Sequence, residues 1–193
     1  MKRYRRYNAI VIGTSAGGLH ALITLLEDLP PDYRIPVMVV QHRVKDDRDL
    51  FEEVLQQKCI ITIRQANEKE PISAGCIYTA PPDYHLLIDS DKTFTLTADE
   101  KVNYARPSID VLFETAAEVY TDKLVGIILT GANSDGCRGI ELIRSHGGLT
   151  IAQDPDEAEF RAMPAAAVES GAVDEVLTLN EIKNFLLAQA TLS

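Results

Sequence analysis

The chain has 193 residues, of which 46% are hydrophobic and 25% are charged, and a chain of this length can bury one sizeable core. Its formal net charge of −10 argues against nucleic acid as the main partner, because phosphate binding needs a basic face. No apolar stretch approaches the roughly 18 residues that cross a bilayer, and three cysteines without metal-type spacing favour reduced thiols and a cytoplasmic protein.

A basic cluster opens the chain and consists of Lys2, Arg3, Arg5 and Arg6. We expect residues 1–7 to form a solvated basic tail, with an acidic partner or a membrane surface as the alternative role for the cluster. A signal peptide is not expected, because polar residues interrupt the apolar run that comes after the charges. Residues 8–193 are predicted to form a single domain.

Strand and helix patterns alternate along the chain. In order, they predict strand 9–13, helix 17–29, strand 36–41, helix 49–57, strands 60–63, 76–80, 86–88 and 93–97, helix 106–120, strand 124–129, helix 136–145, strand 149–152, helix 157–170, strand 173–177 and helix 181–190. Hydrophobicity that is continuous along a strand, rather than alternating, is typical of a buried parallel sheet, and Pro107 suits the first turn of its helix. The sequence therefore predicts an α/β fold: a doubly wound, mostly parallel sheet with helices on both faces and a small β-hairpin insertion near residues 70–98.

Three chemically complementary side chains come after three of these buried strands. Ser15, His42 and Asp135 each stand just past the end of an apolar run. Ligands of open α/β sheets bind in the crevice at the carboxyl ends of the strands. A serine, a histidine and an aspartate brought to that edge are the parts of a nucleophilic hydrolase.

The segment around Ser15 fits a G-x-S-x-G nucleophile elbow, because Gly13 and Gly17 flank the serine where a strand turns into a helix. The alternative is a phosphate-binding loop of the G-x-G-x-x-G kind, with Ser15 in place of the middle glycine. No acidic residue stands at the distance expected for dinucleotide binding, and His42 occupies that region instead.

His42 is the predicted general base, since an imidazole can take the serine proton and return it to the leaving group. Asp135 would orient the ring and stabilise its charged form. Taken singly, His42 fits a surface polar residue and Asp135 fits a turn or helix cap. The remaining histidines, His20, His85 and His146, are expected to have structural roles. No two histidines or carboxylates share a ligand-like spacing, so we expect no metal and no other cofactor.

The order Ser, His, Asp along the chain differs from that of the α/β-hydrolases, chymotrypsin and subtilisin. It resembles the catalytic domain of the CheB family, the chemotaxis protein-glutamate methylesterases. The stretches that carry the resemblance are Ile10 to Gly18, Val40 to His42, Ala80 to His85, Arg106 to Phe113, Leu129 to Gly136, Gln153 to Pro155 and Met163-Pro164. They occur in the order of the family and span nearly the whole chain.

The resemblance implies hydrolysis of γ-glutamyl methyl esters on the cytoplasmic helices of methyl-accepting chemoreceptors, with release of methanol. It also implies deamidation of receptor glutamines as a second reaction by the same acyl chemistry. Ser15 would be the nucleophile, His42 the base and acid, and Asp135 the orienting carboxylate. The amides of Ala16 and Ala132 are the candidate oxyanion donors. Arg106 would contact the substrate, with anchoring of the helix start or a surface ion pair as its alternative role.

Some features depart from the family pattern. Ala132-Asn133 stands where family members often carry Met-Gly, and Cys137 opens a helix, where a thiol pKa can be lowered. For Cys137, packing and a reactive thiol are both open. The chain begins seven residues before the first catalytic strand without the usual receiver domain, so regulation by a separate protein is an expectation. The alternative function is a non-catalytic or nucleotide-binding signalling module on the same fold.

Overall fold

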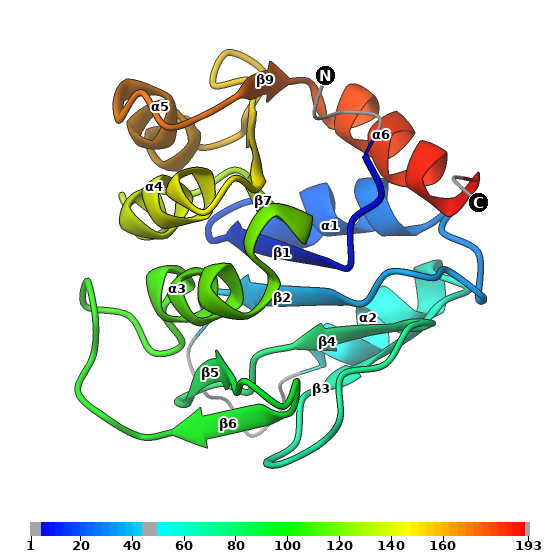
Figure 1. The fold of residues 1–193 in the computed structure, drawn as a ribbon. Helices are drawn as coiled ribbons and strands as arrows, with labels where there is room; N and C mark the ends of the chain where they lie inside the picture. The colour runs from blue at the N-terminus through cyan, green and yellow to red at the C-terminus, as the bar shows by residue number, and fades with distance from the viewer. Residues whose placement is uncertain (1–4, 44–49, 192–193) are drawn as a thin grey trace.

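A seven-stranded parallel sheet crosses the middle of the molecule in the computed structural model, which describes residues 5–43 and 50–191 (Figure 1). The strand order is β3-β4-β2-β1-β7-β8-β9, and every neighbouring pair is parallel. The strands are β1 (Ala9–Thr14), β2 (Val37–Gln41), β3 (Thr62–Gln65), β4 (Cys76–Thr79), β7 (Leu124–Ile128), β8 (Leu149–Gln153) and β9 (Glu175–Leu177). The predicted doubly wound sheet is confirmed.

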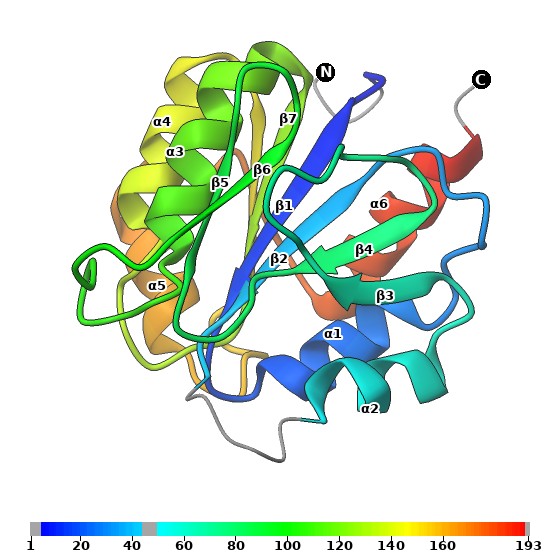
Figure 2. The same cartoon turned by 90° about the horizontal axis from the view of Figure 1, so that it is seen from below.

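Helices cover both faces of this sheet (Figure 2). One face carries α1 (Gly18–Leu26), α2 (Phe51–Lys58) and α6 (Leu179–Thr191), and the other carries α3 (Ile109–Tyr120), α4 (Cys137–Ser145) and α5 (Ala162–Glu169), with a 3-10 turn η2 (Thr121–Lys123) after α3. Along β1, Ile10 and Ile12 belong to the core on the first face, whereas Val11 belongs to the core on the second. Burial on both faces explains why the strands are apolar throughout.

A separate antiparallel hairpin, β5 (His85–Ile88) and β6 (Phe94–Thr97), packs against α3. It is the predicted insertion, and its Phe94 ring meets the Tyr78 ring of β4 edge-on at 4.9 Å between centroids. From β6 the chain runs to α3 through residues 98–108, which we call the strap. The strap passes the carboxyl edge of the sheet, where it lines a cavity.

Two helices begin three or more residues later than the sequence predicts. The helix expected from 157 begins at Ala162, because Phe160 is bound through its amide to the Thr130 hydroxyl and through its carbonyl to the Gly131 amide. The helix expected from 106 begins at Ile109, so Pro107 precedes the helix instead of opening it. At the start of α3, Ser108 and the Ile109 amide are bonded to Asp135, so in both places contacts with a distant loop outweigh the local pattern.

The predicted tail is described only in part, since Lys2 and Arg3 lie outside the described residues, as do position 49 of the second predicted helix and residues 192–193. Arg5 forms an exposed ion pair with Asp122 at 3.3 Å. Tyr7, assigned to the tail, is buried against Phe185 in the core. Within the described ranges, none of the helices is long and apolar enough to span a membrane.

Candidate active site

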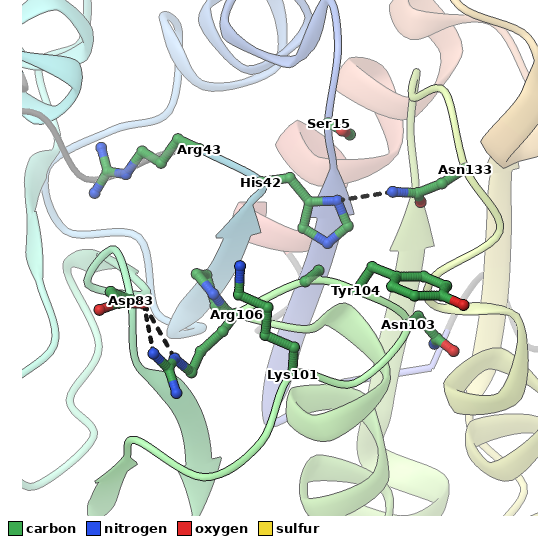
Figure 3. A pocket seen from close by; sticks show the side chains of 11 residues that line it. Ser15, His42, Arg43, Asp83, Lys101, Asn103, Tyr104, Arg106 and Asn133 are labelled. Atoms are coloured by element: carbon green, nitrogen blue, oxygen red, sulfur yellow. Dashed lines mark hydrogen bonds and ion pairs between the residues drawn. The ribbon is translucent and has the colours of Figure 1, made fainter.

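The polar side chains predicted to act together gather at the carboxyl edge of three adjacent strands. β1 lies between β2 and β7, and Ser15, His42 and Asp135 come after these strands in the chain. Nε2 of His42 lies 2.8 Å from Oδ2 of Asp135. Ser15 and His42 line one cavity of about 630 Å³, together with Asn133 and the strap (Figure 3). The three predicted residues therefore meet at this edge, with His42 bonded to Asp135 and Ser15 lining the same cavity as His42.

Ser15 sits in a tight turn between β1 and α1 whose backbone is held from both sides. Its amide donates to the Thr130 carbonyl at 3.0 Å, and its carbonyl accepts from Nε2 of Gln41 at 2.8 Å. Gly17 adopts a left-handed φ of 77°, which favours glycine. A Cβ at Gly18 would lie 2.1 Å from Oε1 of Gln41, so the turn has no room for a side chain there.

Asp135 is the most heavily hydrogen-bonded side chain of the site. Its carboxylate is fully buried and accepts five hydrogen bonds, from His42 Nε2, Asn103 Nδ2, Ser108 Oγ, and the Ile109 and Asp110 amides. Burial alone raises the pKa of this carboxyl, but the hydrogen bonds from His42, Asn103 and Ile109 outweigh burial and hold its pKa below the usual value. Asp135 therefore carries a negative charge at neutral pH and only accepts hydrogen bonds.

Asp135 and Asp110 cap each other's helices. Asp135 precedes α4 and accepts the first amides of α3, while Asp110 in the first turn of α3 accepts the Gly139 amide of α4 at 2.8 Å. Each carboxylate thus satisfies helix amides that lack a partner within their own helix and lies at the positive end of the helix dipole. Burial raises the pKa of Asp110, and the nearby charge of Asp135 adds to this effect.

Asn103 links the two carboxylates and was not predicted from the sequence. Its Nδ2 donates to Oδ2 of Asp110 at 2.8 Å and to Oδ1 of Asp135 at 2.9 Å. Its φ of 51° and that of Tyr104, 63°, form a tight reversal closed by the paired Val102 and Ala105. An asparagine tolerates this conformation better than most residues, but only the fold reveals which carboxylates it reaches. Ser108 was missed for the same reason.

Arg106 anchors the strap. Its guanidinium donates to Oδ1 of Asp83 at 2.7 and 3.1 Å and to the carbonyls of Ala98 and Asp99 at 2.7 and 2.8 Å. These bonds match the anchoring and ion-pair alternative. Arg106 also lines the cavity, and its contact with substrate stays a prediction.

The two predicted oxyanion donors are the backbone amides of Ala16 and Ala132. Neither the Ala16 amide nor the Ala132 amide donates a hydrogen bond to any residue that the structure describes. Ala16 stands at the turn before α1, where the dipole of that helix favours negative charge. Ala132 lies in the loop before Asp135.

A second cavity of about 470 Å³ adjoins the first at Ser15. It is lined on one side by the start of α1, including Leu19 and His20, and on the other by Arg43 and Phe51. The Arg43 guanidinium lies over the Phe51 ring at 4.5 Å from its centroid. Ser15 is therefore approachable from two sides.

Of the other histidines, His20 lines the second cavity, whereas His85 and His146 line neither cavity. His85 is buried, with Nδ1 accepting the Ser108 amide at 3.2 Å and Nε2 bonded to the Glu100 carbonyl. His146 is bonded through Nδ1 to the Leu142 carbonyl at the end of α4. Among residues 5–43 and 50–191, no group of three or more His, Cys, Asp or Glu side chains could hold a metal ion.

All three thiols are expected to be unreactive in the folded protein. Burial, followed by the charge of Asp110, raises the pKa of Cys137 to about 11, so the lowered value considered from its helix position is wrong. Burial also raises the pKa of Cys59 to about 11 and that of Cys76 above its usual value.

We predict no reaction with Ellman's reagent at pH 7.5 until urea unfolds the chain. Rapid labelling of native protein that disappears in Cys137→Ala would contradict this prediction.

A serine in a strand-to-helix turn that shares a cavity with an imidazole, itself bonded to a buried carboxylate, is the arrangement expected of an ester hydrolase on a doubly wound α/β sheet. A family model described as CheB methylesterase matches residues 10–186. The chain therefore belongs to the CheB methylesterase family.

Individual relatives agree with this assignment. A Leptospira interrogans protein, provisionally named protein-glutamate methylesterase/protein-glutamine glutaminase, is 52% identical over 182 residues, 94% of each chain. A Clostridium acetobutylicum protein with that name is 33% identical over 93% of this chain, which spans about half (52%) of the length of that relative. The crystal structure of the Thermotoga maritima CheB methylesterase catalytic domain matches with a TM-score of 0.90 at 32% identity, covering 95% of this chain and 99% of that one. These comparisons support an ester hydrolase and not the alternative of a nucleotide-binding module.

Proposed function

We propose that this protein hydrolyses glutamate γ-methyl esters on the cytoplasmic domains of methyl-accepting chemoreceptors, yielding glutamate side chains and methanol. The names of the relatives support the reaction. The observation that carries the proposal is the hydrogen-bonded pair of His42 and Asp135 beside the half-buried Ser15 in one cavity. Residues 8–193 would form the catalytic domain, and the protein would work in the cytoplasm.

In the first half of the reaction, Ser15 Oγ attacks the γ-carbonyl carbon of the ester while His42 takes the hydroxyl proton on Nδ1. Asp135 accepts from Nε2 and stabilises the charged ring. The tetrahedral intermediate then collapses. The bond to the methoxy oxygen breaks, His42 returns its proton to that oxygen, and methanol leaves an acylated Ser15.

In the second half, a water molecule attacks the acyl carbon and gives a proton to His42. Breakage of the bond to Ser15 Oγ then releases the γ-carboxyl group, and His42 returns the proton to the serine. The amides of Ala16 and Ala132 would stabilise the negative oxygen of both tetrahedral intermediates, since neither is bound within the described part of the chain. A glutamine side chain would react in the same way and release ammonia.

The surroundings of Ser15 suit a side chain presented by another protein. Cavities adjoin Ser15 on both sides, so the segment that carries the ester can extend in either direction. Tyr104, at the tip of the strap, is 98% exposed and lines the larger cavity, which places an aromatic ring beside the approaching protein. In this proposal Arg106 supports substrate binding by holding the strap.

Methanol release from a methylated chemoreceptor cytoplasmic fragment tests the proposed function. We expect wild-type protein to release methanol with saturating dependence on the fragment. Ammonia release from an unmodified fragment measures the deamidase reaction in parallel. Hydrolysis of small methyl esters without release from the fragment would assign the site to a different ester. Release that requires an added cytoplasmic protein would support a separate regulator.

A further inference from the structure

The side chain of Asn133 is fixed between the backbone of Asp135 and the ring of His42. Its Oδ1 accepts the Asp135 amide at 3.1 Å, and its Nδ2 lies 3.2 Å from Nδ1 of His42. A backbone amide can only donate, so this contact identifies Oδ1 and leaves the NH₂ group facing the ring. Asn133 therefore donates a hydrogen bond to the catalytic histidine.

The atom that accepts this bond is the one that the reaction needs. Asp135 is ionised and can only accept, so the proton of the neutral ring is on Nε2, which lies 2.8 Å from Oδ2. Nδ1 then holds the lone pair that must receive the proton of Ser15. Figure 3 shows Ser15 and Asn133 on the same side of the ring, with the bond drawn to Asn133. Ser15 Oγ makes no hydrogen bond within the described residues.

We propose that Asn133 is a positioning residue that covers the general base in the free enzyme and is displaced when the ester binds. Asn133 lines the same cavity as Ser15, so a bound substrate meets its side chain. When Nδ1 takes the proton, two N–H groups would face each other, and the amide must turn away for the step to finish. This proposal rests on the proposed function, because it assigns His42 the role of base.

The hydrogen bond from Asn133 to His42 must break before Ser15 can react, so it should slow the reaction of Ser15. Breaking a single hydrogen bond of ordinary strength corresponds to a factor of about three to ten. Removal of the Asn133 side chain is therefore expected to raise the reactivity of Ser15 by about that factor. A residue that merely supported the loop would instead lower reactivity when removed.

The test compares wild type with Asn133→Ala and Asn133→Gly, using the rate at which a fluorophosphonate labels Ser15. Ser134→Ala is the matched control, because Ser134 is an exposed neighbour in the same loop whose side chain makes no hydrogen bond within the described residues. We expect about threefold to tenfold faster labelling in both Asn133 variants, a matching rise of kcat for a small methyl ester, and wild-type behaviour in Ser134→Ala. The ¹⁵N NMR signal of His42 Nδ1 should move toward that of an unbonded lone pair.

Labelling at or below the wild-type rate in both Asn133 variants, with an unmoved Nδ1 signal, would overturn the proposed role of Asn133 and leave the proposed function standing. If the fluorophosphonate labels neither wild type nor the Asn133 variants, just as it fails to label Ser15→Ala, Ser15 is not an activated nucleophile. That result would overturn the proposed role of Asn133 and the proposed function together. Melting temperatures separate loss of folding from loss of reactivity. If Asn133→Ala melts early, Asn133→Gly and the NMR signal decide the question.

Discussion

Replacing Ser15 by alanine is expected to reduce methyl-ester hydrolysis by about 10⁴- to 10⁶-fold, since loss of a serine nucleophile removes covalent catalysis altogether. Stability should not change. The Ser15 hydroxyl makes no hydrogen bond within the described chain, and the Thr130 and Gln41 contacts involve only the backbone of Ser15. The variant should therefore fold normally while losing its activity.

The measurement is methanol release from a methylated receptor fragment, with thermal unfolding recorded in the same preparations. Ser134→Ala is again the matched control and should retain wild-type turnover. Hydrolysis by Ser15→Ala at a rate close to that of wild type would show that Ser15 is not the nucleophile. An intact melting temperature together with lost activity would assign the defect to chemistry.

The sequence predicts this part of the site because the information is local. Ser15, His42 and Asp135 each come after a short apolar strand, and strands buried on both faces are recognised by continuous hydrophobicity. Parallel strands of one sheet bring the residues beyond their carboxyl ends to the same edge. That reasoning needs no knowledge of how the strands are ordered, although the order β2-β1-β7 is the reason that the three residues are neighbours.

The supporting residues are different, because their roles depend on contacts between distant segments. Asn103 and Ser108 bind Asp135 across 32 and 27 positions of the chain. Their local sequence reads only as a loop that leads into a helix. The late start of α5 has the same origin, since Phe160 is held by Thr130 from 30 positions away. Local patterns therefore predict the candidate nucleophile, base and carboxylate, but not the residues that hold Asp135 in place.

The substitution Asp135→Asn is expected to lower kcat by about 10⁴-fold. The carboxylate accepts from the ring nitrogen and the Ile109 amide on Oδ2 and from three further donors on Oδ1. In Asp135→Asn, one of these oxygens becomes an NH₂ group that faces donors. If it faces His42, the ring must place its proton on Nδ1, the nitrogen that has to be free to act as the base.

The same substitution should destabilise the fold at neutral pH by about 1–3 kcal/mol, the usual effect of leaving one buried donor without an acceptor. The pKa of Asp135 is depressed in the folded state, so its charge contributes stability that is present above the unfolded pKa of about 3.9 and is lost as the pH falls through the folded value. Urea unfolding should therefore show a gap in the free energy of unfolding between wild type and Asp135→Asn at pH 7, and this gap should narrow below about pH 4. Asp156→Asn, whose side chain is 89% exposed, is the matched control and should show no gap. A gap that is constant from pH 7 to pH 3 would mean that the stability depends on the shape of the Asp135 side chain and not on its charge.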